Sequence, residues 1–472
     1  MSLVGLVVLA VLAQSVPELA REARDDFKQD KYAEAREKLH KAVQQSPQNA
    51  ALWSLLGLTD TKLNEIDSAI ADFRKAVELA PGEAQAWFNL GALYGRKGST
   101  GDAILAYGAG LKVDSGNAAA TQNYALLLMS QNRYSEAIPP LEKLKTLDPA
   151  DLGTRAALIG CFAKTRMQTE LAGEVRSALT LPGWTLDRHL KLARMLVQEK
   201  QPEAAQTILE HAVVVSGDSA EAHFGLGLLS LEAGRMEDAV QQLGRAAQID
   251  PASAPYSMRL AEALILWEHY GTAIEFLHAV KPRFGTMPDY QYKLGLAYYG
   301  AHRFPQAIEL LEGIAKERPQ LDRVQFFLGN SYSSTGDLSK AELYLRKAIA
   351  LQPQNGSYYA ALAQVLRKGN EDRTSEAIAN LEKALALEPG DVESKHALAL
   401  CYEKNRDYGR ARELLEQVVA AKADLTSAHV ALARVYYKMH KKAEGDRESA
   451  TVARLQIQEQ EKQSAMRNAA HR

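Results

Sequence analysis

The sequence predicts an all-α fold, an α-solenoid in which one two-helix unit is repeated along the chain. Three sets of residues with a common spacing of 34 positions indicate this fold. The first set consists of turn formers, which interrupt a helix through a lost donor, a fixed φ or a missing side chain. Its members are Pro47, Pro81, Ser115, Pro149, Gly183, Gly217, Pro251, Gly285, Pro319 and Pro353. Interruption at a constant interval indicates copies of one helical unit.

The other two sets are small residues inside the expected helices. One contains Ala35, Ala69, Ala103, Ala137, Ala205, Ala239, Ala273, Ala307 and Ala341, with Leu171 as the exception. The other contains Ala23, Gly57, Gly91, Ala125, Ala193, Gly227, Ala261, Gly295 and Gly329, with Ile159 as the exception. Apolar residues at helical spacing surround them, as Trp87, Leu90 and Tyr94 do. The small residues are therefore predicted to let neighbouring helices approach closely.

The register shifts by two after residue 355 and then returns to 34. This predicts one unit of 36 residues at 356–391, with an insertion between its paired helices within Lys368–Thr374. A surface turn tolerates such an insertion because lengthening a loop costs little. Residues 426–472 are expected to form a terminal partial repeat, a capping helix and a short tail. The polar segment from Ala443 to Gln463 is interpreted as this cap, with a coiled-coil partner as the alternative.

Residues 3–13 form an uninterrupted apolar run, followed by Ala13-Gln14-Ser15 with the small residues of a signal peptidase site. The run is too short to span a bilayer, which needs roughly 20 helical residues. We expect residues 1–15 to be a signal peptide, no membrane span in the mature chain, and a periplasmic, cell-envelope or secreted location. No Lys or Arg precedes the run, so an apolar first helix that caps a cytoplasmic array is the alternative.

Composition and motifs argue against nucleic-acid binding, metal binding and catalysis. Lys and Arg number 56 against 58 Asp and Glu, a balance too even for a dedicated nucleic-acid binder. No metal-binding or catalytic motif is found, so no enzyme activity, metal or cofactor is expected. Cys161 and Cys401 are interpreted as buried packing residues. His189, His223 and His429 occupy the position of Trp53 and Trp87 in their units, and His189 and His223 are interpreted as structural, semi-buried residues.

The unit resembles the tetratricopeptide repeat (TPR), which has 34 residues and the pattern W-x2-L-G-x2-Y, then A-x3-F, then P. In one unit the matching residues are Trp87, Leu90, Gly91, Tyr94, Ala103 and Tyr107. The resemblance covers about twelve units from residue 16 to 425. It implies a right-handed superhelix of antiparallel helix pairs whose first helices line a concave groove. Such a groove suits an extended peptide or a partner helix.

Fourteen residues beside the packing stripe are expected on the face of the groove. They are Phe88, Asn89, Arg96, Asn123, Lys191, Arg194, Phe224, Arg259, Glu262, Tyr292, Lys293, Phe326, Phe327 and Asn330. Aromatic residues and Arg dominate interface hot spots, so these residues are candidates for partner binding. The alternative is that the large side chains cover the seam between helices.

These observations predict a non-enzymatic scaffold that binds a protein or peptide partner and helps to assemble or organise a cell-envelope complex. A cytoplasmic co-chaperone or assembly adaptor is one alternative. An accessory recruiting subunit of an enzyme, such as a transferase, is another. Neither a nucleic-acid partner nor a particular oligomeric state is predicted.

Overall fold

The computed structural model describes residues 14–215, 217–369 and 372–470, and all regular elements in these ranges are α-helices. The signal peptide predicted at 1–15 therefore lies almost entirely outside the described residues. The chain divides into two units between Leu229 and Ser230, each with its own set of helices. The predicted all-α solenoid fold is confirmed.

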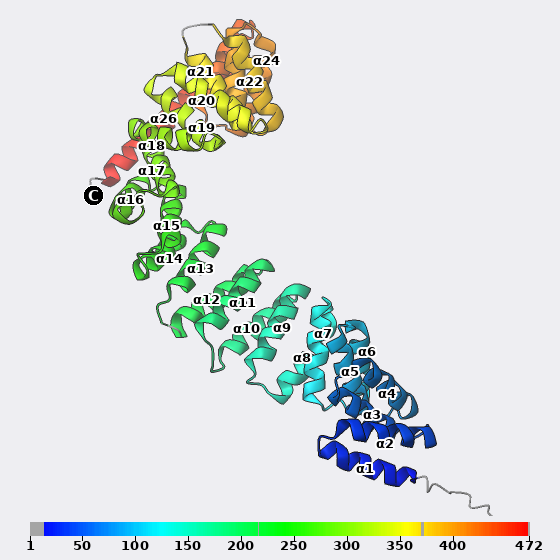
Figure 1. The fold of residues 1–472 in the computed structure, drawn as a ribbon. Coiled ribbons are helices and arrows are strands. Elements are labelled where there is room, and N and C mark those ends of the chain that lie inside the picture. The colour runs from blue at the N-terminus through cyan, green and yellow to red at the C-terminus, as the bar shows by residue number, and fades with distance from the viewer. Residues whose placement is uncertain (1–13, 216, 370–371, 471–472) are drawn as a thin grey trace, which may run out of the picture. The chain divides into compact units, whose positions relative to one another are not determined.

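The first unit is a series of antiparallel helix pairs that follow one another in chain order (Figure 1). Its helices are α1 (Val16–Lys28), α2 (Tyr32–Gln45), α3 (Ala50–Lys62), α4 (Ile66–Leu79), α5 (Ala84–Lys97), α6 (Thr100–Val113), α7 (Ala118–Ser130), α8 (Tyr134–Leu147), α9 (Leu152–Thr165), α10 (Gln168–Leu179), α11 (Leu186–Gln198) and α12 (Pro202–Val215). Helix α13 (Ala220–Glu232) contains the boundary between the units.

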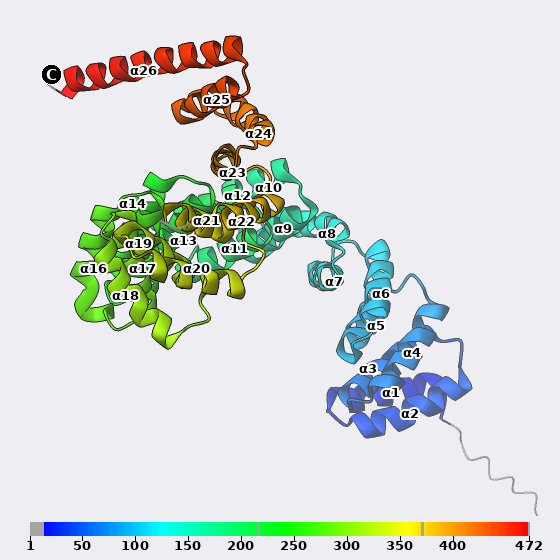
Figure 2. The ribbon, with the colours of Figure 1, turned by 90° about the horizontal axis from the view of Figure 1, so that it is seen from above.

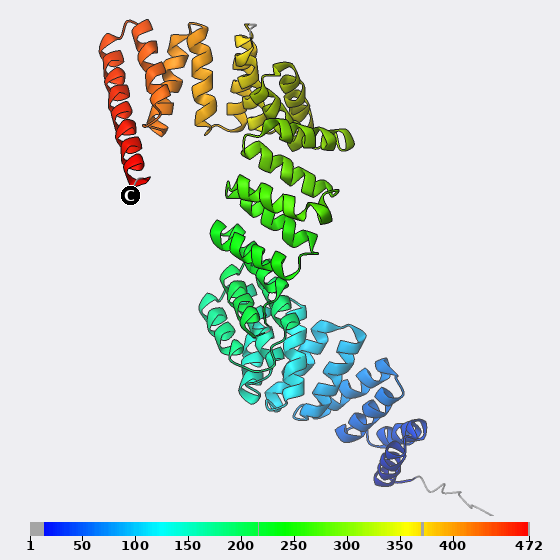
Figure 3. The ribbon, with the colours of Figure 1, turned by 90° about the vertical axis from the view of Figure 1, so that its left-hand side faces the viewer.

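The second unit continues the same arrangement, and its helices run from green to red in Figure 3. They are α14 (Met236–Ile249), α15 (Ala254–Leu266), α16 (Tyr270–Phe284), α17 (Pro288–Gly300), α18 (Phe304–Glu317), α19 (Asp322–Thr335), α20 (Leu338–Leu351), α21 (Gly356–Lys368), α22 (Thr374–Leu387), α23 (Val392–Lys404), α24 (Tyr408–Ala421), α25 (Thr426–Lys438) and α26 (Lys442–Ala470). Five residues join α21 to α22, where three join α23 to α24. Helix α26 begins against α25 and extends well past it (Figure 2).

The first helix of many pairs begins at a side-chain cap placed two residues after a member of the turn-former set. Asn49, Asn117 and Asp151 each accept hydrogen bonds from backbone amides in the first turn of α3, α7 and α9. Thr185 and Asn355 do the same for α11 and α21, and Asp391, two residues after Pro389, does so for α23. These caps satisfy donors that the helix itself leaves unpaired. In these repeats the turn former and the cap together fix where the first helix starts.

In the pairs whose turns are fully described, the turn contains a residue in the left-handed region, and up to Gly336 these residues recur every 34 positions. Their φ values lie between 57° and 89°, although their side chains have nothing in common. The set is Asp30, Asn64, Gly98, Asn132, Arg166, Lys200, Gly234, Glu268, His302 and Gly336, followed beyond the longer unit by Arg406 and His440. A left-handed residue lets the chain reverse within three residues at the end of the first helix.

Glycine is expected to be preferred at this turn position. Replacing Lys200 with Gly should stabilise its repeat by about 0.5–1 kcal/mol, because a side chain disfavours positive φ. Replacing Gly98 with Ala should have the opposite effect, since nothing lies within 4 Å of the added Cβ and only backbone strain acts. Local hydrogen exchange would measure both changes. Equal protection in the two variants would contradict this explanation.

Both sets of small residues lie at helix crossings and are buried. Ala239 and Ala341 have no solvent-exposed surface, like most members of their set. A Cβ added to Gly57 would lie 2.8 Å from the Phe73 ring, and one added to Gly91 would lie 2.8 Å from Tyr107. Such contacts are shorter than packed atoms allow, so the missing side chains are what permits the close approach within each pair.

In several of the described repeats, a side chain on the first helix hydrogen-bonds the carbonyl oxygen six residues earlier. The donor–acceptor pairs are Trp53–Pro47, Trp87–Pro81, Arg155–Pro149, Gln291–Gly285, Gln325–Pro319, Tyr359–Pro353 and His429–Ala423, at 2.8–3.4 Å. The acceptor belongs to the turn that precedes the repeat. This position is therefore a polar link between a helix and the turn before it, in addition to a packing position.

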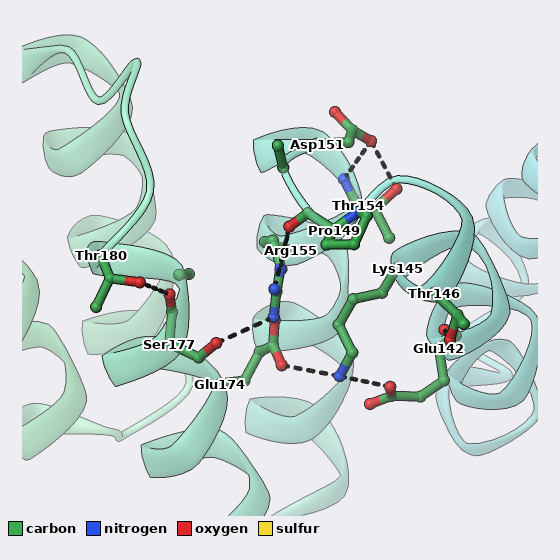
Figure 4. Close-up of polar contacts among 12 residues, drawn as sticks. Glu142, Lys145, Thr146, Pro149, Asp151, Thr154, Arg155, Glu174, Ser177 and Thr180 are labelled. Carbon is green, nitrogen blue, oxygen red and sulfur yellow. Dashed lines mark hydrogen bonds and ion pairs between the residues drawn. The ribbon is translucent and has the colours of Figure 1, made fainter.

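In the first unit this link includes a buried ion pair (Figure 4). Arg155 donates to the Pro149 carbonyl and to Glu174 Oε1 at 2.7 Å, and Glu174 also pairs with Lys145 at 3.1 Å. The Arg155 and Glu174 residues are only 8% and 6% exposed. Lys145 also pairs with Glu142 on its own helix. Because Lys145, Arg155 and Glu174 lie on α8, α9 and α10, the network joins these three helices.

A second buried polar cluster contains two carboxyl groups and one guanidinium. Asp60 on α3 and Asp72 on α4 are 1% and 7% exposed, and Arg36 on α2 pairs with Asp60 at 2.9 Å. Burial, followed by the charge of Asp60, raises the pKa of Asp72 to about 7. Burial raises the pKa of Asp60 as well, against the opposing charges of Arg36 and His40. The joint between α2, α3 and α4 is therefore most stable when it holds a proton.

Replacing Asp72 with Asn should stabilise the first unit by about 1–2 kcal/mol at pH 8. The raised pKa of Asp72 means that the folded chain binds a proton which the unfolded chain releases, so wild-type stability falls as the pH rises from about 4 to about 7. Asn carries no charge and avoids this loss. Thermal unfolding across pH 4–8 would show the gain disappearing at the acidic end. A gain of equal size at pH 4 would contradict a protonation origin.

Helix α26 begins as the partner of α25 and ends as an exposed helix. Gly445 lets the Tyr437 ring lie against its backbone, and His429 Nδ1 lies 2.5 Å from Glu448 Oε2. Residues 456–462 are all exposed, as expected for a polar terminal helix. None of the helices in the described ranges is both long and apolar enough to cross a bilayer.

Candidate functional site

The candidate site is a cleft of about 370 Å3 on three successive first helices of the second unit, α15, α17 and α19. Its apolar and aromatic walls come from Ile265, Leu266, Tyr270, Leu296, Tyr299 and Phe327. Its charged residues are Glu262, Glu268, Lys293 and Arg323, and Tyr292 lies among them. Three consecutive repeats therefore contribute to one cleft on the face where the repeat pattern places a groove.

The tight approach of two helices forms one wall of the cleft. The Tyr270 ring lies so close to Gly300 that a Cβ at this glycine would be 2.2 Å from Tyr270 Cε1. Any side chain at residue 300 would have to displace Tyr270, which lines the cleft. The absence of a side chain at Gly300 therefore determines where the Tyr270 ring lies in the lining of the cleft.

Packed aromatic rings form another part of the lining. Tyr299 and Phe327 meet edge to face with centroids 5.1 Å apart, and Phe326 meets Phe327 at 5.4 Å. Phe326 also packs against Tyr358 of the next first helix at 4.9 Å. Such ring pairs contribute beyond the area that they bury. Phe327 is thus fixed in position and presents its remaining surface to the cleft.

Carboxylates and cations next to the cleft form a chain of ion pairs. Glu262 pairs with Arg259 at 2.9 Å and with Lys293 at 3.3 Å, and Lys293 also pairs with Asp289 at 3.3 Å. Lys293 is mostly buried between its two partners. This cation is therefore already neutralised and holds α15 against α17.

Three polar groups of the cleft lack such partners among the described residues: the carboxylate of Glu268 and two hydrogen-bond donors, on Tyr292 and Arg323. The Tyr292 hydroxyl is buried and has no hydrogen-bond partner in the described residues, and burial raises the pKa of this tyrosine. Arg323 is exposed and forms no ion pair within the part of the chain that is described. Tyr292 and Arg323 line the same cleft, and the positive charge of Arg323 opposes the rise in the pKa of Tyr292.

The structure brings seven of the fourteen predicted groove residues together at this place. Glu262, Tyr292, Lys293 and Phe327 line the cleft itself. Arg259 contacts Glu262 and Phe326 contacts Phe327, so both support the lining from behind. Asn330 faces the Tyr299 hydroxyl and opposes the rise in the pKa of Tyr299 that burial causes. Whether they contact a partner remains a prediction.

The other seven predicted residues lie on first helices of the first unit and are scattered. Asn89 accepts from Gln85, Arg96 donates to Asn64, Asn123 donates to the Tyr107 hydroxyl, and Lys191 pairs with Asp187. Arg194 is exposed and Phe224 is half-buried.

Phe88 is buried, and its ring fills the space that Gly110 leaves on α6. It also stacks on Tyr107 at 6.4 Å. For Phe88 the structure supports the alternative interpretation, in which a large side chain covers the seam between helices.

Sequence reasoning missed Tyr270, Tyr299 and Arg323. Tyr270 is on a second helix, where no groove residue was expected, and only the glycine at 300 hints at its position. Tyr299 follows Tyr298 and is equivalent to the apolar Ile265 in the preceding repeat. The sequence pattern therefore suggests a packing residue at this position. Arg323 lies in the first turn of α19, N-terminal to the positions beside the packing stripe from which the fourteen groove residues were predicted.

The described residues contain no group of three or more His, Cys, Asp or Glu side chains that could hold a metal ion. Cys161 and Cys401 are both buried free thiols. Burial raises the pKa of Cys161 to about 11, which leaves it protonated and unreactive. His189, His223 and His429 are buried, in agreement with a structural role.

Comparison with known proteins identifies the repeat. Models described as "Tetratricopeptide repeat" match residues 88–151, 190–255 and 298–365, and one described as "TPR repeat" matches 57–98. A model of anaphase-promoting complex, cyclosome, subunit 3 matches 370–446. The helix pairs of both units are those of a TPR-class solenoid. The chain belongs to the tetratricopeptide repeat family.

Individual relatives are distant. TPR repeat-containing protein YpiA of Bacillus subtilis is 25% identical over 224 residues, which are 47% of this chain and 51% of the relative. The chain thus spans about half the length of that protein. Formate-dependent nitrite reductase complex subunit NrfG of Escherichia coli O157:H7 is 29% identical over 137 residues, 29% of this chain and 67% of NrfG. The solved structure of Naa15/Naa10 bound to HypK-THB matches with 14% identity over 95% of this chain and 76% of that chain, at a TM-score of 0.46.

Proposed function

We propose that this protein is a non-enzymatic scaffold that binds a protein or peptide partner on the face of its first helices. The cleft on α15, α17 and α19 carries this proposal, because it combines aromatic walls with a hydroxyl and a guanidinium that lack partners among the described residues. Aromatic residues and Arg are the side chains that contribute most to interfaces. A face built from successive repeats suits an extended segment that contacts several helices.

The proposed role is the assembly or organisation of a larger complex. The name of NrfG describes that relative as a subunit of a formate-dependent nitrite reductase complex, which supports this role without extending its partners to the present chain. A cell-envelope location rests on the apolar run at residues 3–13 and on Ala13-Gln14-Ser15. Edman sequencing of the mature chain tests it. A new N-terminus near residue 16 would support export, and an intact N-terminus would favour the cytoplasmic adaptor.

Partner capture should depend on the cleft. Exchanging Arg259 and Phe327 together for Ala should weaken capture of the partner by about tenfold or more, because it removes an aromatic wall and one of the two cations that pair with Glu262. Leu343 and Lys347 are exposed on the second helix α20, and their exchange for Ala is the matched control. Pull-down from envelope and soluble extracts, followed by titration of the purified partner, measures the effect.

Two outcomes would contradict the proposal. Equal capture by the cleft variant and the control variant would place the interface elsewhere. Catalytic turnover by the purified chain alone would reject the non-enzymatic role, whereas a captured transferase would favour the recruiting-subunit alternative. Circular dichroism of each variant ensures that a loss of binding is not a loss of helicity.

A further inference from the structure

The cleft contains donors for which the described chain supplies no acceptor. The Tyr292 hydroxyl is buried without a hydrogen-bond partner. A buried donor left in this state costs free energy, so a group that accepts its hydrogen bond would be favoured. Arg323 beside it presents a guanidinium without an ion pair among the described residues, and its charge acts on the Tyr292 hydroxyl. Both residues point to an acceptor with negative charge.

Three of the carboxylates near these donors are engaged elsewhere. Asp289 pairs with Lys293, and Glu262 pairs with Arg259 and Lys293. Asp322 accepts a hydrogen bond from the Tyr358 hydroxyl at 2.5 Å. None of these three carboxylates is paired with Arg323. Glu268, another carboxylate that lines the cleft, has no ion pair with Arg323 among the described residues either, so Tyr292 and Arg323 can both donate to an acceptor on a bound partner.

The space around the two donors can hold more than a small anion. Tyr292 and Arg323 line the main cleft and also a second hollow of about 290 Å3 between α17, α18 and α19. The main cleft continues toward Leu296, Tyr299 and Phe327, which form an apolar and aromatic surface. Because both hollows adjoin Tyr292 and Arg323, a bound peptide can extend past these two donors and need not end at them.

We propose that the cleft binds an internal peptide segment in which an Asp or Glu side chain lies close to a large apolar side chain. The carboxylate accepts hydrogen bonds from Tyr292 and Arg323, and the apolar side chain packs against Leu296, Tyr299 and Phe327. This inference rests on the proposed peptide-binding function and names the chemistry of the partner. A charge-assisted bond to Arg supplies specificity, while the aromatic wall supplies buried area.

The test uses the full chain and a library of random dodecapeptides displayed on phage, in which every peptide is fused at its C-terminus and presents no free terminal carboxylate. Selection is expected to enrich peptides with Asp or Glu within a few residues of Phe, Leu, Trp or Met. A synthetic copy should lose about tenfold in affinity when its acidic residue is changed to the amide, because a charge-assisted hydrogen bond is lost. Raising the salt concentration should weaken the acidic peptide more than the amide peptide.

Variants of the protein assign the effect to residues. Arg323→Gln should remove the preference for the acidic peptide, and Arg283→Gln, at an exposed position on the second helix α16, should not. Tyr292→Phe should weaken the acidic peptide without lowering the melting temperature, because the hydroxyl that it removes has no partner among the described residues of the free protein. A merely structural role for this hydroxyl would change stability and leave peptide binding unaltered.

The outcomes separate this inference from the proposed function. One outcome would overturn the acidic specificity and leave peptide binding intact. In it, the enriched peptides lack acidic residues, bind the Arg323→Gln variant normally and do not bind the Phe327→Ala variant. Binding restricted to synthetic peptides with a free C-terminal carboxylate would overturn the internal segment. If no peptide is enriched, or if Phe327→Ala binds all of them normally, the proposed use of the cleft fails as well.

Discussion

Replacing Glu174 with Ala is expected to destabilise the region of α8, α9 and α10 by about 3–5 kcal/mol. The substitution leaves Arg155 buried without its carboxylate and also frees Lys145 from one partner. A buried charge without a counter-charge cannot recover the hydration that it lost on folding. Hydrogen exchange of the three helices measures the local loss, and denaturant unfolding measures its effect on the unit.

The chain itself provides a control and a rescue. Glu37 pairs with Lys41 on the surface of α2, with side chains 72% and 57% exposed, and its exchange for Ala should leave stability nearly unchanged. Trp87 and Ala106 occupy the positions of Arg155 and Glu174 two repeats earlier. The double exchange Arg155→Trp and Glu174→Ala should therefore recover most of the lost stability. A cost below about 1 kcal/mol for Glu174→Ala alone would contradict a tight ion pair at this place.

The position that Arg155 occupies in its repeat shows which features of the fold could be predicted from the sequence and which could not. The repeat length, the turn formers and the small residues were predicted correctly because each acts through one steric property that only a few residue types possess. The helix-to-turn link was not predicted, since Trp, Arg, Gln, Tyr and His share only the capacity to donate a hydrogen bond. A position with a common hydrogen bond and varied side chains carries no pattern in the sequence alone.

The left-handed turn residues escaped prediction for a related reason. Lys200, Glu268 and His302 adopt positive φ at a modest cost, which the packing of the two flanking helices outweighs. The conformation is imposed by the distance between the paired helices, and the residue only has to tolerate it. The glycines at 98, 234 and 336 would have been a signal if their spacing had been compared with that of the neighbouring repeats.

The candidate site was predicted in part. The helical face was enough to select Glu262, Tyr292, Lys293 and Phe327, because the repeat places them beside the packing stripe. It was not enough to show that Lys293 is neutralised by two carboxylates or that Arg323 has no ion pair among the described residues. Such facts depend on contacts between neighbouring repeats, which a repeat pattern does not specify. The site's chemistry therefore emerges only when the helices are packed together.

Replacing Ala341 with Leu is expected to destabilise the α19–α20 pair by about 1–3 kcal/mol. Ala341 is fully buried where the two helices cross, and its carbonyl oxygen lies 3.2 Å from the position that a Cβ of Gly329 would take. A larger side chain at this crossing must push the helices apart, because the neighbouring Leu345 already fills the space left by Gly329. Hydrogen exchange of α19 and α20 measures the loss, and Ala350→Leu at an exposed position on α20 is the matched control.

The distribution of the effect matters as much as its size. In a solenoid each repeat contacts only its neighbours, so the loss of protection should be greatest in α19 and α20, smaller in α18 and α21, and absent in α25. The cleft contains Arg323 and Phe327 from α19, so the same substitution should weaken partner capture although residue 341 does not line the cleft. Unchanged protection of α19 and α20 would show that the small residues do not set the distance between paired helices. A uniform loss across the second unit would instead show that its repeats unfold together.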